Sequence, residues 1–482
     1  MWKIDIKAPF GGYSPRWFKN TNSTYGNSNQ ANAMTNIDMS DPSALKQGFG
    51  ITTVTDNSDL TAELVDIGES DRTFQLAIEN TAKLHSLSGT VLDNLTNFPH
   101  TISGTSVVGQ SVFLDVNLGY FYFYRTNTGA DIGKASNLDG TPTFDDDWGS
   151  TTDAGLKVFT GAKYPVTSID INNSSYMVFG NIQYMGYYDG VTLDVQAIDF
   201  GAGKIVSDMS ATNDYVYVSV NDAEGENIHT KGIIYVVSDP TTTTWVDTIN
   251  VNGKIGATIV KDGIVYVFHQ KNASDEITLS YVNGNRLEKL TTFDGALPRY
   301  GQVTIWKDLI MFRSDHKIYS FGQIAEGQGN ILFSNISPKY THTSVDYGAI
   351  ANANGKLWIS SSDNSTNHDL SYQNGNTVTS SWTSLVFNVS NGDSLAMIDS
   401  LTIYTNALEA NAKCDLKIYK NQGQTLVKTL EISETGKTRH VFRNLGLNDI
   451  EDFKIVLDYS SGSATKLVDI RQINIKGHNY EL

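Results

Sequence analysis

A short run of aliphatic and aromatic residues recurs along the middle of the chain at nearly constant spacing, and this repeat limits the fold more than any other feature. The clearest runs are centred on Val178, Tyr217, Tyr266, Met311 and Trp358, which lie 39, 49, 45 and 47 residues apart. Apolar and polar residues alternate around these runs, as in half-buried β-strands. Repeats of about 40 to 50 residues made of short strands are typical of β-propeller blades.

Two weaker runs, Phe74 to Leu84 and Tyr120 to Tyr124, extend the repeat toward the N-terminus. Together the runs predict about seven blades between residues 51 and 375, with six or eight as alternatives. Pairs that favour hairpin turns lie between the runs: Asp189-Gly190, Asn252-Gly253, Asp262-Gly263, Asn283-Gly284, Asn354-Gly355 and Asn374-Gly375. A series of stacked sandwiches is the alternative architecture.

The repeat ends after Tyr372, and the remaining residues predict a second domain. Seven short strands in about 100 residues favour a β-sandwich or jelly roll over residues 376–482. The strand candidates are Leu385 to Val389, Ile398 to Tyr404, Leu416 to Tyr419, Leu426 to Ile432, Arg439 to Phe442, Phe453 to Tyr459 and Leu467 to Lys476. The expected fold class is therefore all-β, a propeller followed by a sandwich.

The first 50 residues differ from both domains. Residues 20–32 are rich in Asn, Ser and Thr and show no alternation. This composition predicts an extended N-terminal arm over residues 1–50 that orders only against another surface. Trp17, Phe18 and Tyr25 are its candidate interface anchors, because aromatic side chains dominate binding energy in interfaces. A mobile tail, or an arm packed on its own propeller, is the alternative.

Charge and cysteine content exclude several classes. Acidic residues outnumber basic ones by 52 to 35, for a net charge of −17, and no two Lys or Arg residues are adjacent. Coating of nucleic acid needs clustered basic residues, so the acidity indicates solubility, or a passage that DNA crosses without specific binding. The single Cys414 alternates with Leu416 and Ile418 and predicts a buried thiol. Neither a signal peptide nor an apolar run of about 18 residues is present, which predicts assembly in a cytoplasm and no membrane insertion.

Sequence motifs for catalysis, cofactors or metals are weak. Gly436-Lys437-Thr438 ends like a phosphate-binding loop, but Glu431 stands where that motif requires glycine, and the Gly322, Gly327 and Gly329 loop lacks the Lys-Ser/Thr pair. Residues 145–147, three aspartates, suggest either a calcium site or an exposed acidic loop, and the latter is favoured. Residues 139–144 approach the aspartate box of sialidase propellers in a single copy. We therefore predict no catalytic residue, no cofactor and no metal, and hence no enzyme.

The N-terminal segment resembles the start of many phage tail and neck proteins. In that family a glycine pair, an Asn-rich stretch and a phrase of the form D-P-x-A-L-x-x-R-P-G precede the first blade. The corresponding residues here are Gly11-Gly12, residues 27–36, and residues 41–50, with Gly48-Phe49 in place of Arg-Pro. The C-terminal domain, from Trp382 to Ile475, also resembles the terminal domain of such proteins.

This resemblance implies a structural virion protein of a tailed bacteriophage, either a tail nozzle or hub or a neck component. Such a protein would form a homo-oligomeric ring with other tail proteins around the DNA exit channel, after assembly in the host cytoplasm. Two alternatives stay open from the sequence. One is a receptor protein or depolymerase on the particle that binds host surface glycan, and the other is a free propeller glycosidase.

Overall fold

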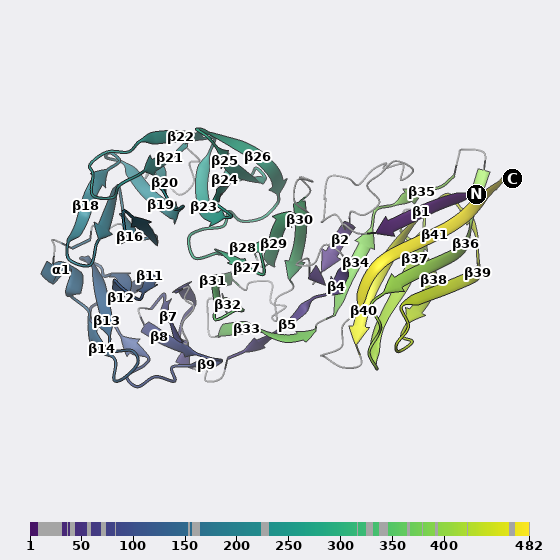
Figure 1. Cartoon of the computed structure of the whole chain (residues 1–482), viewed down its shortest axis with the longest axis horizontal. Helices are drawn as coiled ribbons and strands as arrows, with labels where there is room; N and C mark the ends of the chain where they lie inside the picture. Colours follow the sequence, from purple (N-terminus) through teal and green to yellow (C-terminus); the bar gives the residue numbers. More distant parts are fainter. Residues whose placement is uncertain are drawn as a thin grey trace.

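The structure is a computed structural model that describes residues 1–7, 31–35, 37–38, 44–54, 59–68, 74–81, 83–152, 155–156, 164–222, 231–315, 317–323, 331–336, 346–363, 367–377, 379–390, 394–421, 423–461 and 468–481. These ranges contain 41 β-strands and one short helix, α1 (Trp148–Thr152). None of the described segments is a helix long and apolar enough to span a membrane. The strands form a ring of small sheets and, beside it, a sandwich of two long sheets (Figure 1), which confirms the predicted all-β class.

Seven antiparallel sheets form the ring, and each is one blade of a β-propeller. Blade 1 contains β6 (Leu64–Ile67), β7 (Phe74–Glu79), β8 (Lys83–Ser88), β9 (Val91–Leu92) and β10 (His100–Thr101); blade 2 contains β11 (Val108–Asp115), β12 (Gly119–Arg125), β13 (Ala130–Ser136) and β14 (Thr143–Asp145). Blade 3 contains β15 (Val166–Ile171), β16 (Ser174–Asn181), β17 (Tyr184–Tyr188) and β18 (Leu193–Asp199); blade 4 contains β19 (Lys204–Ala211), β20 (Val216–Asp222), β21 (Gly232–Val237) and β22 (Asp247–Val251). Blade 5 contains β23 (Lys254–Lys261), β24 (Ile264–Gln270), β25 (Ile277–Asn283) and β26 (Arg286–Phe293); blade 6 contains β27 (Val303–Trp306), β28 (Leu309–Ser314), β29 (Lys317–Gln323) and β30 (Ile331–Ile336).

Blade 7 closes the ring with strands from both ends of the propeller sequence. It consists of β31 (Asp346–Ala353), β32 (Lys356–Ser362), β33 (His368–Thr377) and β5 (Phe49–Thr53). The outermost strand, β5, pairs antiparallel with β33. The first strands of all seven blades contact one another in a closed circle, from β6 to β31 and back to β6. A closed ring leaves only short free edges, which is how propellers protect their strands.

The sequence repeat corresponds to the second strand of each blade. Val178, Tyr217, Tyr266, Met311 and Trp358 lie on β16, β20, β24, β28 and β32, and the two weaker runs fall in blades 1 and 2. A second strand lies in the interior of its sheet, and each sheet packs against a blade on either side. The middle of such a strand is therefore buried on both faces, as in β16 and β24, and it appears in the sequence as an unbroken apolar run.

Four of the six predicted turn pairs lie in hairpin turns within blades, and two do not. Asp262-Gly263 and Asn354-Gly355 have positive φ at both residues, as a two-residue turn requires. Asn252-Gly253 instead connects blade 4 to blade 5. Asn374-Gly375 lies inside β33, where the register shifts between Gln373 and Thr377, so the predicted turn is a bulge.

The second domain is a sandwich of two sheets. One sheet contains β3 (Ile37–Asp38), β4 (Leu45–Gln47), β1 (Trp2–Lys7), β41 (Asp469–Glu481), β36 (Ser394–Thr405) and β39 (Arg439–Ile450). The other contains β2 (Ala31–Thr35), β34 (Ser380–Ser384), β35 (Phe387–Asn388), β40 (Asp452–Ser461), β37 (Ala412–Lys420) and β38 (Thr425–Ile432). All seven strand candidates of the sequence overlap strands of these sheets, whereas β34 was not predicted.

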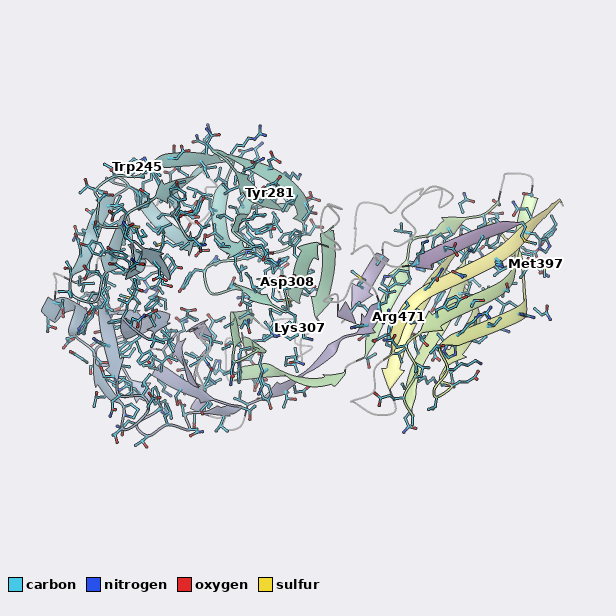
Figure 2. The ribbon with its side chains drawn as sticks, in the orientation of Figure 1. Trp245, Tyr281, Lys307, Asp308, Met397 and Arg471 are labelled. Carbon is cyan, nitrogen blue, oxygen red and sulfur yellow. The ribbon has the colours of Figure 1, made fainter. Side chains whose placement is uncertain are left out.

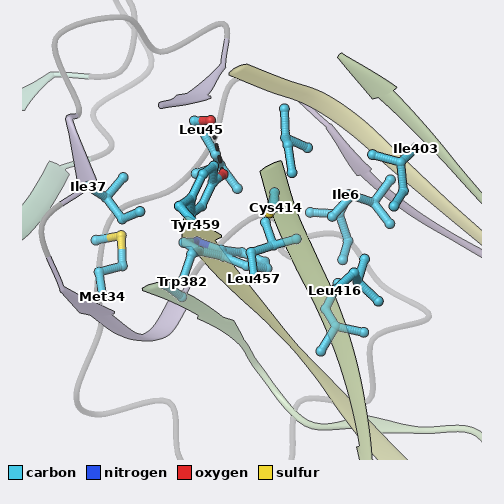
Figure 3. Packing of buried hydrophobic residues seen from close by; sticks show 14 of the residues in the cluster. Ile6, Met34, Ile37, Leu45, Trp382, Ile403, Cys414, Leu416, Leu457 and Tyr459 are labelled. Carbon is cyan, nitrogen blue, oxygen red and sulfur yellow. Dashed lines mark hydrogen bonds between the residues drawn. The ribbon is translucent and has the colours of Figure 1, made fainter. Parts of the chain in front are cut away.

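The N-terminal segment is not an extended arm where the structure describes it, which corrects the prediction for residues 1–50. Strand β1 pairs with β41 over six residues, β2 pairs with β34, and β4 pairs with β41. Ile6 and Leu45 are fully buried in the sandwich core, and the Tyr459 hydroxyl donates a 3.0 Å hydrogen bond to the Leu45 carbonyl (Figure 3). The physical reason is the alternation of Trp2, Ile4 and Ile6 with charged residues, which gives β1 one apolar face to bury.

One hydrophobic core extends from the sandwich into the propeller. The same cluster of buried side chains that contains Trp382 and Tyr459 also contains Trp306 and Met311 of blade 6 and Leu357 of blade 7. The chain also crosses between the domains twice, from β4 in the sandwich to β5 in blade 7, and from β33 in blade 7 back to β34 in the sandwich. Shared apolar packing and two crossings make a firmer joint than a flexible linker would.

Candidate functional site

Two buried carboxylates, Asp66 and Asp208, lie on innermost strands of the propeller, where a propeller glycosidase would hold its catalytic pair. Both sit at a β-bulge. The register of β6 shifts between Leu64 and Asp66, and the register of β19 shifts between Val206 and Asp208. Because a bulge changes the direction of the side chain beside it, both carboxylates can reach the neighbouring blade.

Each carboxylate fastens its own blade to the next one. Asp66 accepts hydrogen bonds from the Ile67 amide at 3.0 Å and from the Val112 amide of blade 2 at 2.9 Å. Asp208 accepts from the Met209 amide at 2.8 Å and from the Thr258 amide of blade 5. Burial raises the pKa of Asp208 to about 7, although its hydrogen bonds with Thr258 and Met209 act in the opposite direction.

Hydroxyl groups make equivalent contacts at other junctions between blades. The contacts are Leu64 amide to Ser360 Oγ at 3.0 Å, Ser111 Oγ to the Tyr164 carbonyl at 2.5 Å, and Asn352 amide to Thr304 Oγ1 at 3.0 Å. Each joins one blade to the blade or connection that follows. The polar groups around the axis thus satisfy backbone amides and carbonyls that would otherwise be buried without partners.

The connection between β26 and β27, residues 294–302, runs across the inner ends of the blades. Its Tyr300 donates a 3.1 Å hydrogen bond to Asp66, and the Gly301 carbonyl accepts from the Ile350 amide of blade 7 at 2.8 Å. A Cβ placed on Gly256 of blade 5 would collide with the carbonyl of Pro298. Burial, with the nearby charges of Asp66 and Asp208, holds the pKa of the Tyr300 hydroxyl well above its usual range. The connection therefore contacts blades 1, 5 and 7 at once.

The contacts of Asp66 and Asp208 suit a structural role, in which they join neighbouring blades, better than the role of a hydrolytic pair. Glycoside hydrolysis needs two carboxyl groups about 5 to 10 Å apart with room between them for sugar and water. Here both carboxylates accept hydrogen bonds from backbone amides of a neighbouring blade. The Tyr300 hydroxyl donates to Asp66, and the charges of Asp66 and Asp208 both raise its pKa.

Replacement of Tyr300 by Phe tests this role. The ring packs against the core shared by blades 2 and 3 and would stay in place, but Asp66 would lose the hydrogen bond from the Tyr300 hydroxyl. We expect a loss of about 1 to 2 kcal/mol in the free energy of unfolding, measured by urea denaturation. Tyr281→Phe removes a surface hydroxyl bonded to Glu288, and we expect it to lower the free energy of unfolding clearly less than Tyr300→Phe does. Equal costs for the two variants would contradict the axial role.

A second buried cluster lies within blade 1. The His85 Nδ1 atom is 2.7 Å from Asp93, and its Nε2 atom is 3.7 Å from Glu79, with all three side chains almost completely buried. Burial alone would raise the pKa of Glu79, but the nearby His85 imidazole and hydrogen bonds from Thr81 and the residue 61–62 amides lower it to about 2. Burial likewise opposes protonation of His85, yet Asp93 and Glu79 raise its pKa. The His85 imidazole between two carboxylates therefore joins β7, β8 and the residues that flank these strands.

The three aspartates at 145–147 do not converge on a shared point. Asp146 accepts hydrogen bonds from His100 at 2.8 Å, from Ser103, and from the Tyr122 hydroxyl at 2.5 Å. These partners outweigh the effect of burial and hold the pKa of Asp146 below its usual range. Asp145 and Asp147 are exposed. Within the described ranges, no group of three or more His, Cys, Asp or Glu side chains could hold a metal ion.

Of the remaining candidates from the sequence, some lie in the core or in a turn, and the others lie outside the described residues. Cys414 is fully buried, as predicted, and burial raises the pKa of its thiol well above the usual value. Gly436-Lys437-Thr438 lies in the turn between β38 and β39, where Lys437 pairs with Glu434 at 2.7 Å. Trp17, Phe18 and Tyr25, the predicted interface anchors, lie outside the residues that the structure describes, as do Gly327 and Gly329.

Asp66, Asp208 and Tyr300 are only weakly marked in the sequence. Each aspartate interrupts an apolar run, in Leu64-Val65-Asp66-Ile67 and Val206-Ser207-Asp208-Met209, and a lone charge in a buried strand needs a partner. Tyr300 lies in a loop-like stretch, and nothing in its local sequence indicates a contact 234 residues away.

Comparison with known proteins gives no family. No family model matches the chain, and no curated protein matches it. Among solved structures, the chain is similar to an exo-β-1,3-galactanase from Phanerochaete chrysosporium, at 12% identity and a TM-score of 0.31 over 90% of this chain and 100% of that one. It is similar to the WD40 propeller domain of Doa1 at 11% identity and a TM-score of 0.43, over 68% and 97% of the two chains, and to the Dos1 propeller at 10% and 0.40, over 64% and 78%. These likenesses concern the propeller fold and say nothing about activity.

Proposed function

We propose that this chain is a non-enzymatic structural component of a tailed phage virion, a nozzle, hub or neck protein that forms a ring around the DNA exit channel. The main observation that supports the proposal is that the polar side chains near the propeller axis join neighbouring blades. Asp66, Asp208 and Tyr300 all make hydrogen bonds of this kind. A propeller stiffened at its axis and joined to a sandwich through one core is suited to bear load in an assembly.

The position of residues 294–302 bears on where DNA would pass. Because this connection contacts inner strands of three blades, the axis of a single propeller is a poor path for a duplex. In the proposed ring the channel would instead lie between copies of the chain. Net charge −17 would let DNA slide along such a channel without binding.

Electron microscopy of the purified native assembly tests the proposal. We expect the chain in a ring at a tail or neck position, located with an antibody or a fused tag at its C-terminus. A chain that occurs only free, or only on a fibre that contacts host cells, would contradict the nozzle, hub or neck role.

A polysaccharide panel with product detection tests the non-enzymatic part separately. We expect turnover of no member by the purified chain, and no difference between the chain and its Asp208→Asn variant. Release of oligosaccharides that is lost in this variant would replace the proposal with a depolymerase or glycosidase that uses the axial carboxylates.

A further inference from the structure

Within the described part of the propeller, six large apolar side chains are exposed, although apolar residues are usually buried. They are Val116, Val191, Tyr215, Trp245, Val246 and Ile264. Val191 keeps 87% of its surface exposed and Val246 keeps 59%. Single exposed apolar residues need no explanation, but a group of them on one surface indicates an interaction site.

The topology places all six on the same face of the propeller. In an antiparallel blade, the turn between the first and second strands and the turn between the third and fourth strands lie at the same end. Val116 and Tyr215 belong to first-to-second turns of blades 2 and 4, and Ile264 begins β24 directly after that turn in blade 5. Val191, Trp245 and Val246 belong to third-to-fourth turns of blades 3 and 4. We call this surface the hairpin face, formed by residues 116, 189–192, 212–215, 238–246 and 262–264.

Trp245, labelled in Figure 2, is held in place before any partner arrives. Its ring lies 4.7 Å from that of Tyr235 and 6.0 Å from that of Phe200, centroid to centroid. The Val246 amide donates to the Val236 carbonyl at 2.8 Å, which fixes the backbone beside it. A pre-ordered aromatic side chain loses little entropy on binding and is the usual anchor of a protein interface.

The charges on these turns are mainly negative. Asp189, Asp239 and Asp262 lie on the hairpin face, with Asp214 and Asp247 on the same turns or next to them. The neighbouring Lys261 is engaged by Asp262 and by Asp308 at 2.8 Å. A partner with Lys or Arg around an apolar centre would complement this surface, whereas a second copy of this acidic chain would bring like charges together.

We infer that the hairpin face of blades 2 to 5 binds a different protein, one that presents an apolar centre surrounded by basic residues. Valine and isoleucine at the turn tips favour a protein over a glycan, because sugars stack on aromatic rings. A surface that spans four blades also matches a protein footprint better than a sugar site. The inference goes beyond the proposed function, since it applies to any assembly that contains this chain.

Photo-cross-linking in the native cells tests the inference. A photoreactive amino acid is placed at Val191 or Val246, and, for the matched controls, at Asn127 or Ser274, which are exposed in second-to-third turns on the opposite face. We expect one protein adduct from positions 191 and 246, at least tenfold above either control, with the cross-linked peptide rich in Lys or Arg. Val116→Asp should lower the adduct yield at position 246 about tenfold without lowering the unfolding temperature, because its side chain is 69% exposed.

Other outcomes would overturn the inference. These are an adduct with a second copy of this chain, an adduct with glycan, equal yields from the two faces, or no adduct from position 191 or 246. Incorporation of the chain into particles is measured in the same cells. An adduct without particles would contradict the proposed virion role alone, and particles without an adduct would contradict the hairpin-face inference alone.

Discussion

Residues 376–482 expressed alone will remain unfolded, although the sequence predicts a separable sandwich there. The sandwich takes β1, β2, β3 and β4 from residues 2–47, and Ile6, Met34 and Leu45 from these strands are buried in its core. A fragment without them exposes the apolar side of β41 and β40. Burial of each large aliphatic side chain contributes about 1.5 to 3 kcal/mol, so the loss of these three is comparable with the whole stability of a small domain, about 5 to 15 kcal/mol.

A fusion restores the missing strands and serves as the matched control. The Gly48 amide donates a 3.0 Å hydrogen bond to Ser380 Oγ, so residue 48 and the start of β34 are neighbours. A glycine-rich linker of about six residues can therefore join residues 1–48 to residues 379–482. We expect cooperative thermal unfolding from the fusion and none from residues 376–482, by calorimetry. Cooperative unfolding of the short fragment would contradict the interwoven sandwich.

Deletion of residues 2–47 should act on the sandwich more than on the propeller. The sequence-based expectation is a folded propeller that fails to join its particle. The structure also predicts a folded propeller after the deletion, because β5, the strand that closes the ring, begins at Phe49. If the truncated chain fails to join its particle, the cause will be the unfolded sandwich, which calorimetry detects as the loss of one of two unfolding transitions.

The propeller was predictable because its signal is local. The second strand of each blade is buried on both faces, and runs such as Tyr176 to Phe179 repeat at blade spacing. A constant number of strands per blade then converts that spacing into a blade count. The sandwich strands after Tyr372 were visible for a similar reason, since alternation along β36 and β37 is long enough to recognise.

The role of the N-terminus was not predictable from composition, although part of its signal was present. Alternation over Trp2 to Lys7 marks β1 as a strand, but its partner β41 lies more than 460 residues away. Strands such as β3, of two residues, and β4, of three, are too short for a periodicity to show. The axial site was hidden for the same reason, because Asp66 and Tyr300 meet only after the ring closes.

The free energy of unfolding should be greatest near pH 4 to 5 and should fall as the pH rises toward 7. Asp208 has an ordinary pKa of 3.8, and burial raises the pKa to about 7 in the folded chain. Between these values the unfolded chain releases a proton that the folded chain retains, so a rise in pH favours unfolding. At about 1.36 kcal/mol for each pKa unit, the loss approaches about 4 kcal/mol by pH 7.

Glu79 produces the opposite slope on the acid side. Its pKa is about 2 in the folded chain against an ordinary 4.5, so its contribution is complete above pH 4.5 and is lost as the pH falls toward 2. Urea denaturation from pH 3 to 8 measures both slopes. Asp208→Asn should abolish most of the fall between pH 4 and 7, and Glu79→Gln should flatten only the acid side. His85, whose pKa is raised by Asp93 and Glu79, adds a smaller loss at higher pH in both Asp208 forms. An equal slope between pH 4 and 6 in the unmodified chain and in Asp208→Asn would contradict this prediction and would show that Asp208 is ionised in the folded chain, where the Met209 and Thr258 amides donate to it.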